Sequence, residues 1–105
     1  MVKEGMIKHV VLWKLKDSVD GKPKPELAKE LKIALEGLKG KIPEVRALEV
    51  GFNFNPADTA SDISLYTEFK SREDLDRYQK HPEHVKVAEL VKKLTVERRA
   101  SDYEA

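Results

Sequence analysis

The sequence predicts an α+β domain of the ferredoxin-like class, in which a four-stranded antiparallel sheet carries helices on one face. Three observations lead to this class. Three segments have alternating apolar residues, which is typical of strands, and a fourth, more charged segment closes the chain. Two regions between them have apolar residues at helical spacing. The resulting order is β-α-β-β-α-β, and the 105 residues suit a single domain spanning residues 1–105.

The first half of the chain is expected to form a strand, a polar loop and a long helix. Residues 6–16 alternate, and one face of this strand carries Ile7, His9, Val11, Trp13 and Leu15. After the loop at residues 17–24, Pro25 suits the first position of a helix because it has no N–H to leave unpaired. The apolar stripe of the helix consists of Leu27, Leu31, Ala34, Leu35 and Leu38. Gly40 is expected to end the helix, and Pro43 prevents its continuation.

Two further strands are expected in the middle of the chain. Residues 46–55 alternate and place Leu48, Val50, Phe52 and Phe54 on one side. Residues 63–70 alternate and place Ile63, Leu65, Thr67 and Phe69 on one side. The turn-rich segment 55–62 joins them, so an antiparallel hairpin is the natural pairing.

The second helical region is interrupted by the string His81-Pro82-Glu83-His84. Ser71 followed by Asp74 resembles a capping box, which predicts that a helix begins after Ser71. Pro82 can then begin a second helical segment. The apolar residues of that segment are Val87, Ala88, Val91 and Leu94. Residues 95–103 are charged but retain apolar positions, and we interpret them as the closing strand.

The face of the sheet that the helices leave open is expected to be partly apolar. It would carry Val10, Leu12 and Tyr66. An apolar patch of this size exposed to water usually marks an interaction surface. We therefore expect a homodimer in which two copies pair sheet against sheet, with two-fold symmetry.

The composition excludes several classes of function. Lys and Arg number 20 and Asp and Glu number 19, for a net charge of +1, which argues against a dedicated nucleic-acid binder. The absence of cysteine removes disulfides, thiolate metal sites and Cys nucleophiles. No apolar run approaches the ~20 residues that a membrane span requires, and residues 1–5 do not lead into a signal-peptide core. We expect a cytoplasmic protein without a membrane partner.

The reactive candidates are the three histidines and one tyrosine. His9 lies on the core face of its strand, where it is either a hydrogen-bonded core group or part of a pocket lining. His81 could cap the segment that begins at Pro82. His84 falls in the first turn of that segment, where the helix dipole favours a neutral imidazole that can act as a base. Tyr78 is either core filler or a donor to a substrate oxygen.

Other kinds of site have weak support. The histidine spacing lacks the four-residue separation of zinc-binding helices, so we expect no metal. The five glycines are scattered, which excludes a phosphate-binding loop. The basic pairs Lys92-Lys93 and Arg98-Arg99 are flanked by glutamates and are interpreted as a solvated charged face.

Several motifs together resemble one family. They are Ile7-Lys8-His9-Val10-Val11-Leu12, Ile42-Pro43-Glu44-Val45, Phe69-Lys70-Ser71-Arg72-Glu73, Tyr78-Gln79-Lys80-His81-Pro82-Glu83-His84-Val85 and Asp102-Tyr103. In this combination the sequence resembles the stress-responsive A/B barrel domain (Dabb) family, from about Met6 to Tyr103. The resemblance implies a ferredoxin-like subunit that dimerises into an α/β barrel.

The resemblance also suggests a chemistry. One plant branch of the family comprises polyketide cyclases of the olivetolic acid cyclase type, which catalyse an intramolecular aldol condensation without a cofactor. Carried over by motif, His84 would be the base, Tyr78 would assist it, and His9 would line the pocket. The aliphatic Leu31 and Leu35 stand where the plant cyclases have aromatic pocket residues, so a large aromatic polyketide is not expected.

Two classes of function follow from these residues. The first is a cofactor-independent cyclase-like, lyase-like or isomerase-like enzyme, or a binder, that acts on a small carbonyl compound. In this class His84 and Tyr78 are catalytic, and the pocket is formed by His9, Val11, Trp13, Leu31 and Leu35. The second is a non-catalytic dimeric stress-related or scaffold protein. A relationship to cofactor-free monooxygenases rests on fold analogy alone.

Overall fold

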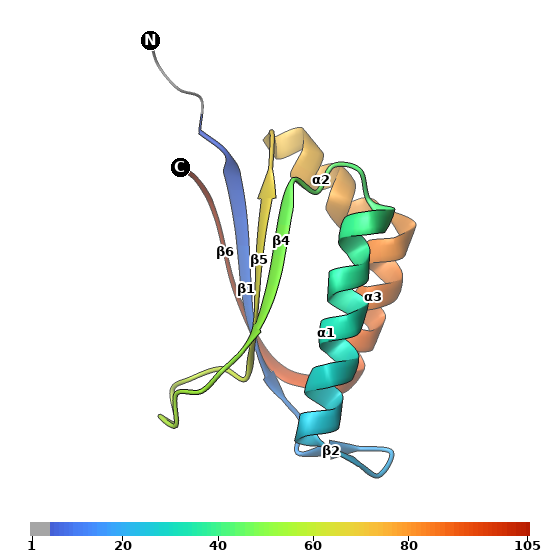
Figure 1. The fold of residues 1–105 in the computed structure, drawn as a ribbon, viewed down its shortest axis with the longest axis vertical. Helices are drawn as coiled ribbons and strands as arrows, with labels where there is room; N and C mark the ends of the chain where they lie inside the picture. The colour runs from blue at the N-terminus through green and yellow to red at the C-terminus, as the bar shows by residue number, and fades with distance from the viewer. Residues whose placement is uncertain (1–4) are drawn as a thin grey trace.

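The computed structural model describes residues 5–105 and shows four long strands in one antiparallel sheet, with helices against one face (Figure 1). The strands are β1 (Ile7–Leu15), β4 (Ala47–Phe52), β5 (Ile63–Phe69) and β6 (Thr95–Glu104). Their order across the sheet is β4-β5-β1-β6, so β1 pairs with both β5 and β6. This is the ferredoxin-like arrangement, and the predicted fold class is confirmed.

The helices are α1 (Lys24–Lys41), α2 (Arg72–Lys80) and α3 (Pro82–Leu94), and α1 and α3 lie side by side on the sheet (Figure 1). Both predicted caps are present. The Ser71 hydroxyl accepts a hydrogen bond from the Asp74 N–H at 3.1 Å. Nδ1 of His81 accepts one from the Glu83 N–H at 3.1 Å, at the point where Pro82 begins α3. The break between α2 and α3 is therefore built by His81 and Pro82.

The first half differs from expectation in two details. The polar loop contains a small hairpin, β2 (Ser18–Val19) and β3 (Lys22–Pro23). Its turn residues Asp20 and Gly21 have φ of 51° and 78°, and positive φ at both central residues is what a type I′ hairpin turn requires. Helix α1 begins at Lys24 and continues through Gly40 to Lys41. Ile42 is extended, with φ −118° and ψ 106°, because a residue before proline disfavours the helical conformation. Pro43, rather than Gly40, therefore determines where α1 ends.

The core lies between the sheet and the helices. All five predicted core-face residues of β1 are buried, as are the four of β5. The leucines of the α1 stripe pack against them: Leu27, Leu31, Leu35 and Leu38. On β4 the pattern is only partly core, because Phe52 is 48% exposed under the Lys32 ammonium and Phe54 is 99% exposed. β4 is an edge strand that ends at Phe52, so Phe54 lies beyond the sheet.

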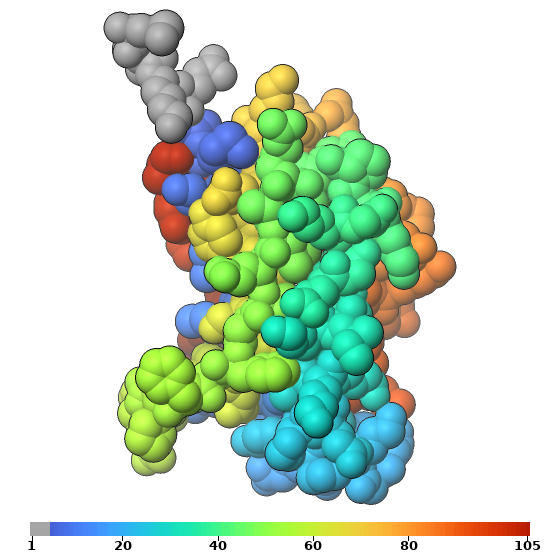
Figure 2. All heavy atoms as spheres, viewed as in Figure 1, coloured from blue at the N-terminus to red at the C-terminus, as the bar shows by residue number. Residues whose placement is uncertain are grey.

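The opposite face of the sheet has no helix against it (Figure 1). Its apolar and aromatic members are half-buried or exposed: Val10, Leu12, Tyr66 and Tyr103. The connection between β4 and β5, light green in Figures 1 and 2, projects from the sheet on this open side. Between residues 5 and 105, no helix combines the length and the apolar character that crossing a lipid bilayer demands.

Candidate functional site

A cavity of about 160 Å³ lies between the sheet and the helices, and side chains from β1, β5, β6 and all three helices line it. It contains six of the seven residues selected from the sequence: His9, Val11, Trp13, Leu35, Tyr78 and His84. The seventh, Leu31, is fully buried in the core and does not line the cavity. The helical spacing of α1 places Leu31 and Leu35 on the same apolar stripe, but only Leu35 lines the cavity.

Tyr78 is at the centre of the site. Its side chain is fully buried, and its ring contacts the Phe69 ring with centroids 4.9 Å apart. The His84 ring stands edge-on to it at 4.5 Å, and the His9 ring lies at 6.2 Å. The three aromatic groups that the family motif suggests for the site are therefore neighbours in space.

Three polar atoms at this cavity are buried without a hydrogen-bond partner in the described chain: Trp13 Nε1, the Tyr78 hydroxyl and His84 Nδ1. Buried polar groups in proteins are almost always paired, and an unpaired one carries a desolvation penalty. The three residues that carry these atoms line the same cavity. Two of them can donate a hydrogen bond and the third, on a neutral imidazole, can accept one. Together they form a ready set of partners for a small polar ligand.

The surroundings set the protonation states of these groups. Burial raises the pKa of Tyr78 to about 12, so its hydroxyl keeps its proton at neutral pH. Burial also lowers the pKa of His84 from its ordinary value, and electrostatic interactions with His9, Arg98 and His81 act in the same direction. The nearby Gln79 backbone acts in the opposite direction. His84 is consequently neutral at pH 7 and able to take up a proton.

His9 differs from these groups because it is paired. Its Nδ1 donates a hydrogen bond to Oδ1 of Asp102, which lies opposite it in the β1–β6 register. Its backbone carbonyl accepts a hydrogen bond from the Thr67 hydroxyl at 2.8 Å. The side chain is buried and also lines the cavity. His9 is thus both a hydrogen-bonded core group and a part of the pocket wall, which combines the two readings of its position.

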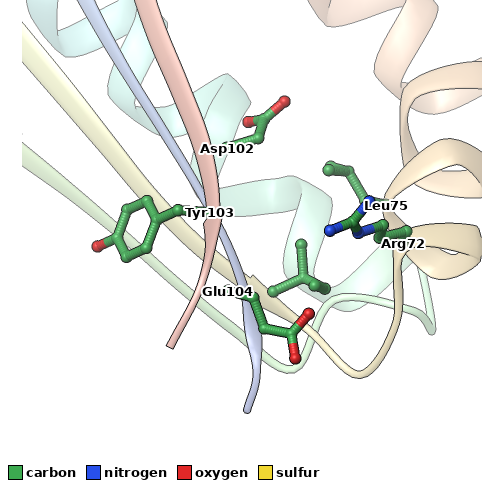
Figure 3. Close-up of a pocket in the computed structure, with 6 residues that line it drawn as sticks. Arg72, Leu75, Asp102, Tyr103 and Glu104 are labelled. Atoms are coloured by element: carbon green, nitrogen blue, oxygen red, sulfur yellow. The ribbon is translucent and has the colours of Figure 1, made fainter.

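A second hollow, of about 310 Å³, lies near the end of the chain and is shown in Figure 3. In the figure Asp102 and Tyr103 point to opposite sides of β6, and Arg72 extends from α2 on the side of Asp102. The lining combines Arg72 with two carboxylates, Asp102 and Glu104, and none of its atoms is buried without a partner. Because buried polar atoms without a partner occur only beside His84 among the described residues, that cavity is the better candidate site.

The cavity wall also has a charged part that the sequence did not predict. Lys92 of α3 and Arg98 of β6 both line it and are otherwise exposed. The strand alternation separates Arg98 from Arg99, which lies opposite Leu12 on the open face. Applying the same alternation of faces to residues 95–103 would have predicted that Arg98 lies on the core side of the sheet, as Trp13 does. Among residues 5–105, no group of three His, Asp or Glu side chains is arranged to hold a metal ion.

Comparison with known proteins identifies the family and the fold. The family model described as "Stress Responsive A/B Barrel Domain" matches residues 7–105. A crystal structure from Bacteroides fragilis, described as a dimeric protein of unknown function with a ferredoxin-like fold, is 39% identical with a TM-score of 0.83, over 95% of this chain and 96% of that one. An uncharacterized protein of Streptomyces coelicolor is 33% identical over 79 residues, which are 75% of this chain and 79% of the relative. A hydroxynitrile lyase from Passiflora edulis has the same fold, with a TM-score of 0.82 at 13% identity over 95% of this chain and 93% of that one.

Proposed function

The chain belongs to the stress-responsive A/B barrel domain (Dabb) family, and we propose that it is a cofactor-independent enzyme that removes a proton from the carbon next to a carbonyl group of a small compound. The single observation that carries this proposal is the set of three buried, unpaired polar atoms around one cavity. Enolate chemistry needs a base and hydrogen-bond donors for the oxygen that becomes negative. The cavity contains one candidate base and two candidate donors.

His84 is the proposed base. Its unpaired Nδ1 takes the proton from the carbon, and the electron pair of the broken C–H bond moves into the enolate. The lowered pKa of His84 keeps the ring neutral before the step, which makes Nδ1 available. The imidazolium then returns the proton to the enolate or to the group that forms in a condensation. No oxidant, metal or bound cofactor is required by these steps.

The hydroxyl of Tyr78 and the N–H of Trp13 are the proposed donors. Both are buried and unpaired, so each can hydrogen-bond the carbonyl oxygen as it gains negative charge. Removing one such donor typically lowers a rate by about 10²–10³-fold. The cavity volume of about 160 Å³ is below the ~300–1,000 Å³ of pockets for drug-sized ligands, which supports a small substrate.

Exchange of hydrogen for deuterium tests the proton-removal step directly. Wild-type protein is incubated with small ketones, such as acetone and 2-butanone, in D₂O, and loss of the α-proton signal is followed by NMR. We expect exchange above the buffer rate with wild type, none above it with His84→Gln, and a large decrease with Tyr78→Phe. His81→Gln is the matched control, since His81 caps α3 and does not line the cavity. A wild-type rate equal to that of buffer for every ketone would contradict the proposal.

We also propose that the protein is a homodimer that buries the open face of the sheet. The solved relative from Bacteroides fragilis is described as dimeric. The open face of this chain presents Leu12 at 36% and Tyr103 at 45% exposure, beside the half-buried Val10 and Tyr66. Size-exclusion chromatography with light scattering should give twice the 12.0 kDa chain mass. Leu12→Asp should shift the protein toward monomer, whereas Ile33→Asp, on the exposed side of α1, should not.

A further inference from the structure

The cavity beside His84 has positively charged side chains at its solvent-exposed edge, which we call the rim. Two cationic side chains, Lys92 and Arg98, line the cavity, and no Asp or Glu does. Both residues are exposed overall, so their charged groups remain accessible to an incoming ligand. Arg98 is near enough to His84 to contribute to the lowering of its pKa. The cavity therefore changes from apolar walls with hydrogen-bonding groups to a positive rim.

Lys92 and Arg98 differ from the basic residues next to them because they have no acidic partner in the described chain. Lys93, next to Lys92, pairs with the Asp20 carboxylate at 3.0 Å. Arg99, next to Arg98, pairs with the Glu97 carboxylate at 3.1 Å. Within residues 5–105, neither Lys92 nor Arg98 has an acidic partner within ion-pair distance. In each basic pair, the residue at the cavity is the one left without an anion.

We infer that the ligand of this cavity is a small oxo acid, whose carboxylate binds Arg98 and Lys92 at the rim and whose carbonyl reaches the inner donors. This inference rests on the proposed function and adds the chemical class of the substrate to it. A guanidinium matches a carboxylate with two parallel hydrogen bonds, and an ammonium adds a point charge. The apolar side chains that line the rest of the cavity suit the short carbon chain of such a compound: Val11, Leu35, Leu65, Val87, Ala88 and Val91.

The orientation follows from the same arrangement. With its carboxylate held at the rim, an oxo acid directs its carbonyl toward the buried part of the cavity, where the Tyr78 hydroxyl and the Trp13 N–H are unpaired. The carbon next to the carbonyl then lies in the cavity with His84. Arg98 is on the helix-covered side of β6, away from the open face that a second copy would cover. The rim thus stays free in the proposed dimer.

Fluorescence of Trp13 gives a direct readout of binding, because it is the one tryptophan of the chain and lines the cavity. The probes are pyruvate, 2-oxobutyrate, acetoacetate and levulinate, each compared with its methyl ester, which keeps the carbonyl and loses the charge. A charge-assisted hydrogen bond corresponds to at least about a tenfold change in affinity. We therefore expect at least one acid to bind about tenfold more tightly than its ester, and this preference to weaken as salt is added.

Variants of the two basic pairs distinguish the contribution of the rim to ligand affinity from the contribution of general surface charge. Arg98→Gln should lower affinity for the acid about tenfold and leave the ester unchanged, and Lys92→Gln should have a smaller effect of the same kind. Arg99→Gln and Lys93→Gln remove the same charges from neighbouring positions and should leave both affinities unchanged. Circular dichroism confirms that each variant is folded.

The outcomes distinguish this inference from the proposed function. Equal binding of acids and esters, or equal effects of Arg98→Gln and Arg99→Gln, would overturn the oxo-acid inference while the enolate proposal stands. Inorganic phosphate that competes as well as the acids would also overturn it, since the rim would then be a general anion site. If neither acids nor esters perturb Trp13 and no ketone exchanges its α-proton, both proposals fail.

Discussion

Two sets of buried polar groups lie on the helix-covered side of the sheet, and they differ in whether the protein pairs them. In the paired set, His9 is bonded to Asp102 across the β1–β6 register, and the Thr67 hydroxyl donates to the His9 carbonyl. In the unpaired set, Trp13, Tyr78 and His84 each bury a polar atom without a partner among the described residues. The Tyr78 ring brings the two sets together, because it lies 4.5 Å from the His84 ring of its own set and 6.2 Å from the His9 ring of the paired set.

The difference shows how one small core divides its polar groups between stability and binding. A paired buried group contributes about 0.5–1.5 kcal/mol to stability, whereas an unpaired one costs about 1–3 kcal/mol. Three unpaired atoms around one cavity are therefore a net burden on the folded chain. A ligand that pairs them relieves this burden, which is the physical basis for placing the site here rather than at the polar hollow of Figure 3.

The largest effect is expected from removing the Tyr78 ring, which contacts both sets. Tyr78→Ala deletes a fully buried ring that packs against Phe69, and we expect it to lower the free energy of unfolding by about 3–5 kcal/mol. Urea denaturation followed by circular dichroism measures this. A loss below about 1 kcal/mol would show that the ring is not part of the core, because a cavity of that size cannot form so cheaply in a packed interior.

Removing one hydroxyl from each set sharpens the comparison. Thr67→Val deletes the donor to the His9 carbonyl and should lower the free energy of unfolding by about 1–2 kcal/mol. Tyr78→Phe deletes a hydroxyl that has no partner and should change it by less than about 0.5 kcal/mol or raise it. Both substitutions preserve the shape of the side chain. Equal losses for the two variants would remove the distinction between the sets.

His81 allows a similar comparison with His84 inside one motif. Its Nδ1 caps α3, so His81→Ala should cost about 1 kcal/mol of stability, and His81→Asn, which restores a capping acceptor, should recover most of it. Neither variant should alter binding at the cavity, which His81 does not line. Thermal melts and Trp13 fluorescence titrations measure the two properties separately. A loss of ligand affinity in the well-folded His81→Asn variant would assign His81 to the site.

Most of the fold could be predicted from the alternation of apolar residues and from the residues that cap helices, because both depend only on neighbours a few positions away. The alternation of residues 7–15 and 63–69 corresponds to the observed buried and exposed faces. The caps at Ser71 and His81 also depend on neighbours only two or three positions away. The two-residue strands of the β2–β3 hairpin are too short for any such pattern, and they were missed.

The site was only partly predictable because its key relations are long-range. His9 and Asp102 are 93 positions apart, and no local spacing reveals that they are bonded. Whether Tyr78 and His84 are unpaired depends on every element around the cavity. The Lys92 and Arg98 rim was hidden for a simpler reason: each residue stands beside a second cation, and only the geometry of α3 and β6 separates the member at the cavity from its solvated neighbour.

The smallest expected effect is a pH dependence of stability that arises from His84 in the unpaired set. The pKa of His84 is lower in the folded protein than its ordinary value of 6.5, mainly because the ring is buried. Below pH 6.5 the unfolded chain therefore binds a proton at His84 more readily than the folded chain does, so stability should fall as the pH drops from 6.5 toward the lowered folded pKa. Above pH 6.5 the ring is neutral in both states, and this contribution disappears.

A comparison with His84→Gln isolates this contribution from the other groups that titrate in the same range. His9, His81 and the permanent charge of Arg98 face His84 and remain in both proteins, so the difference between their stability curves reports His84. Urea denaturation between pH 5 and 7.5 should give a variant whose stability decreases less than that of wild type as acid is added. Parallel curves would mean that folding does not disfavour the charged ring, and the neutral base required for proton removal would lose its physical support.

An acid ligand at the rim should reduce the dependence of wild-type stability on pH, since its carboxylate compensates the Arg98 charge that helps to keep His84 neutral.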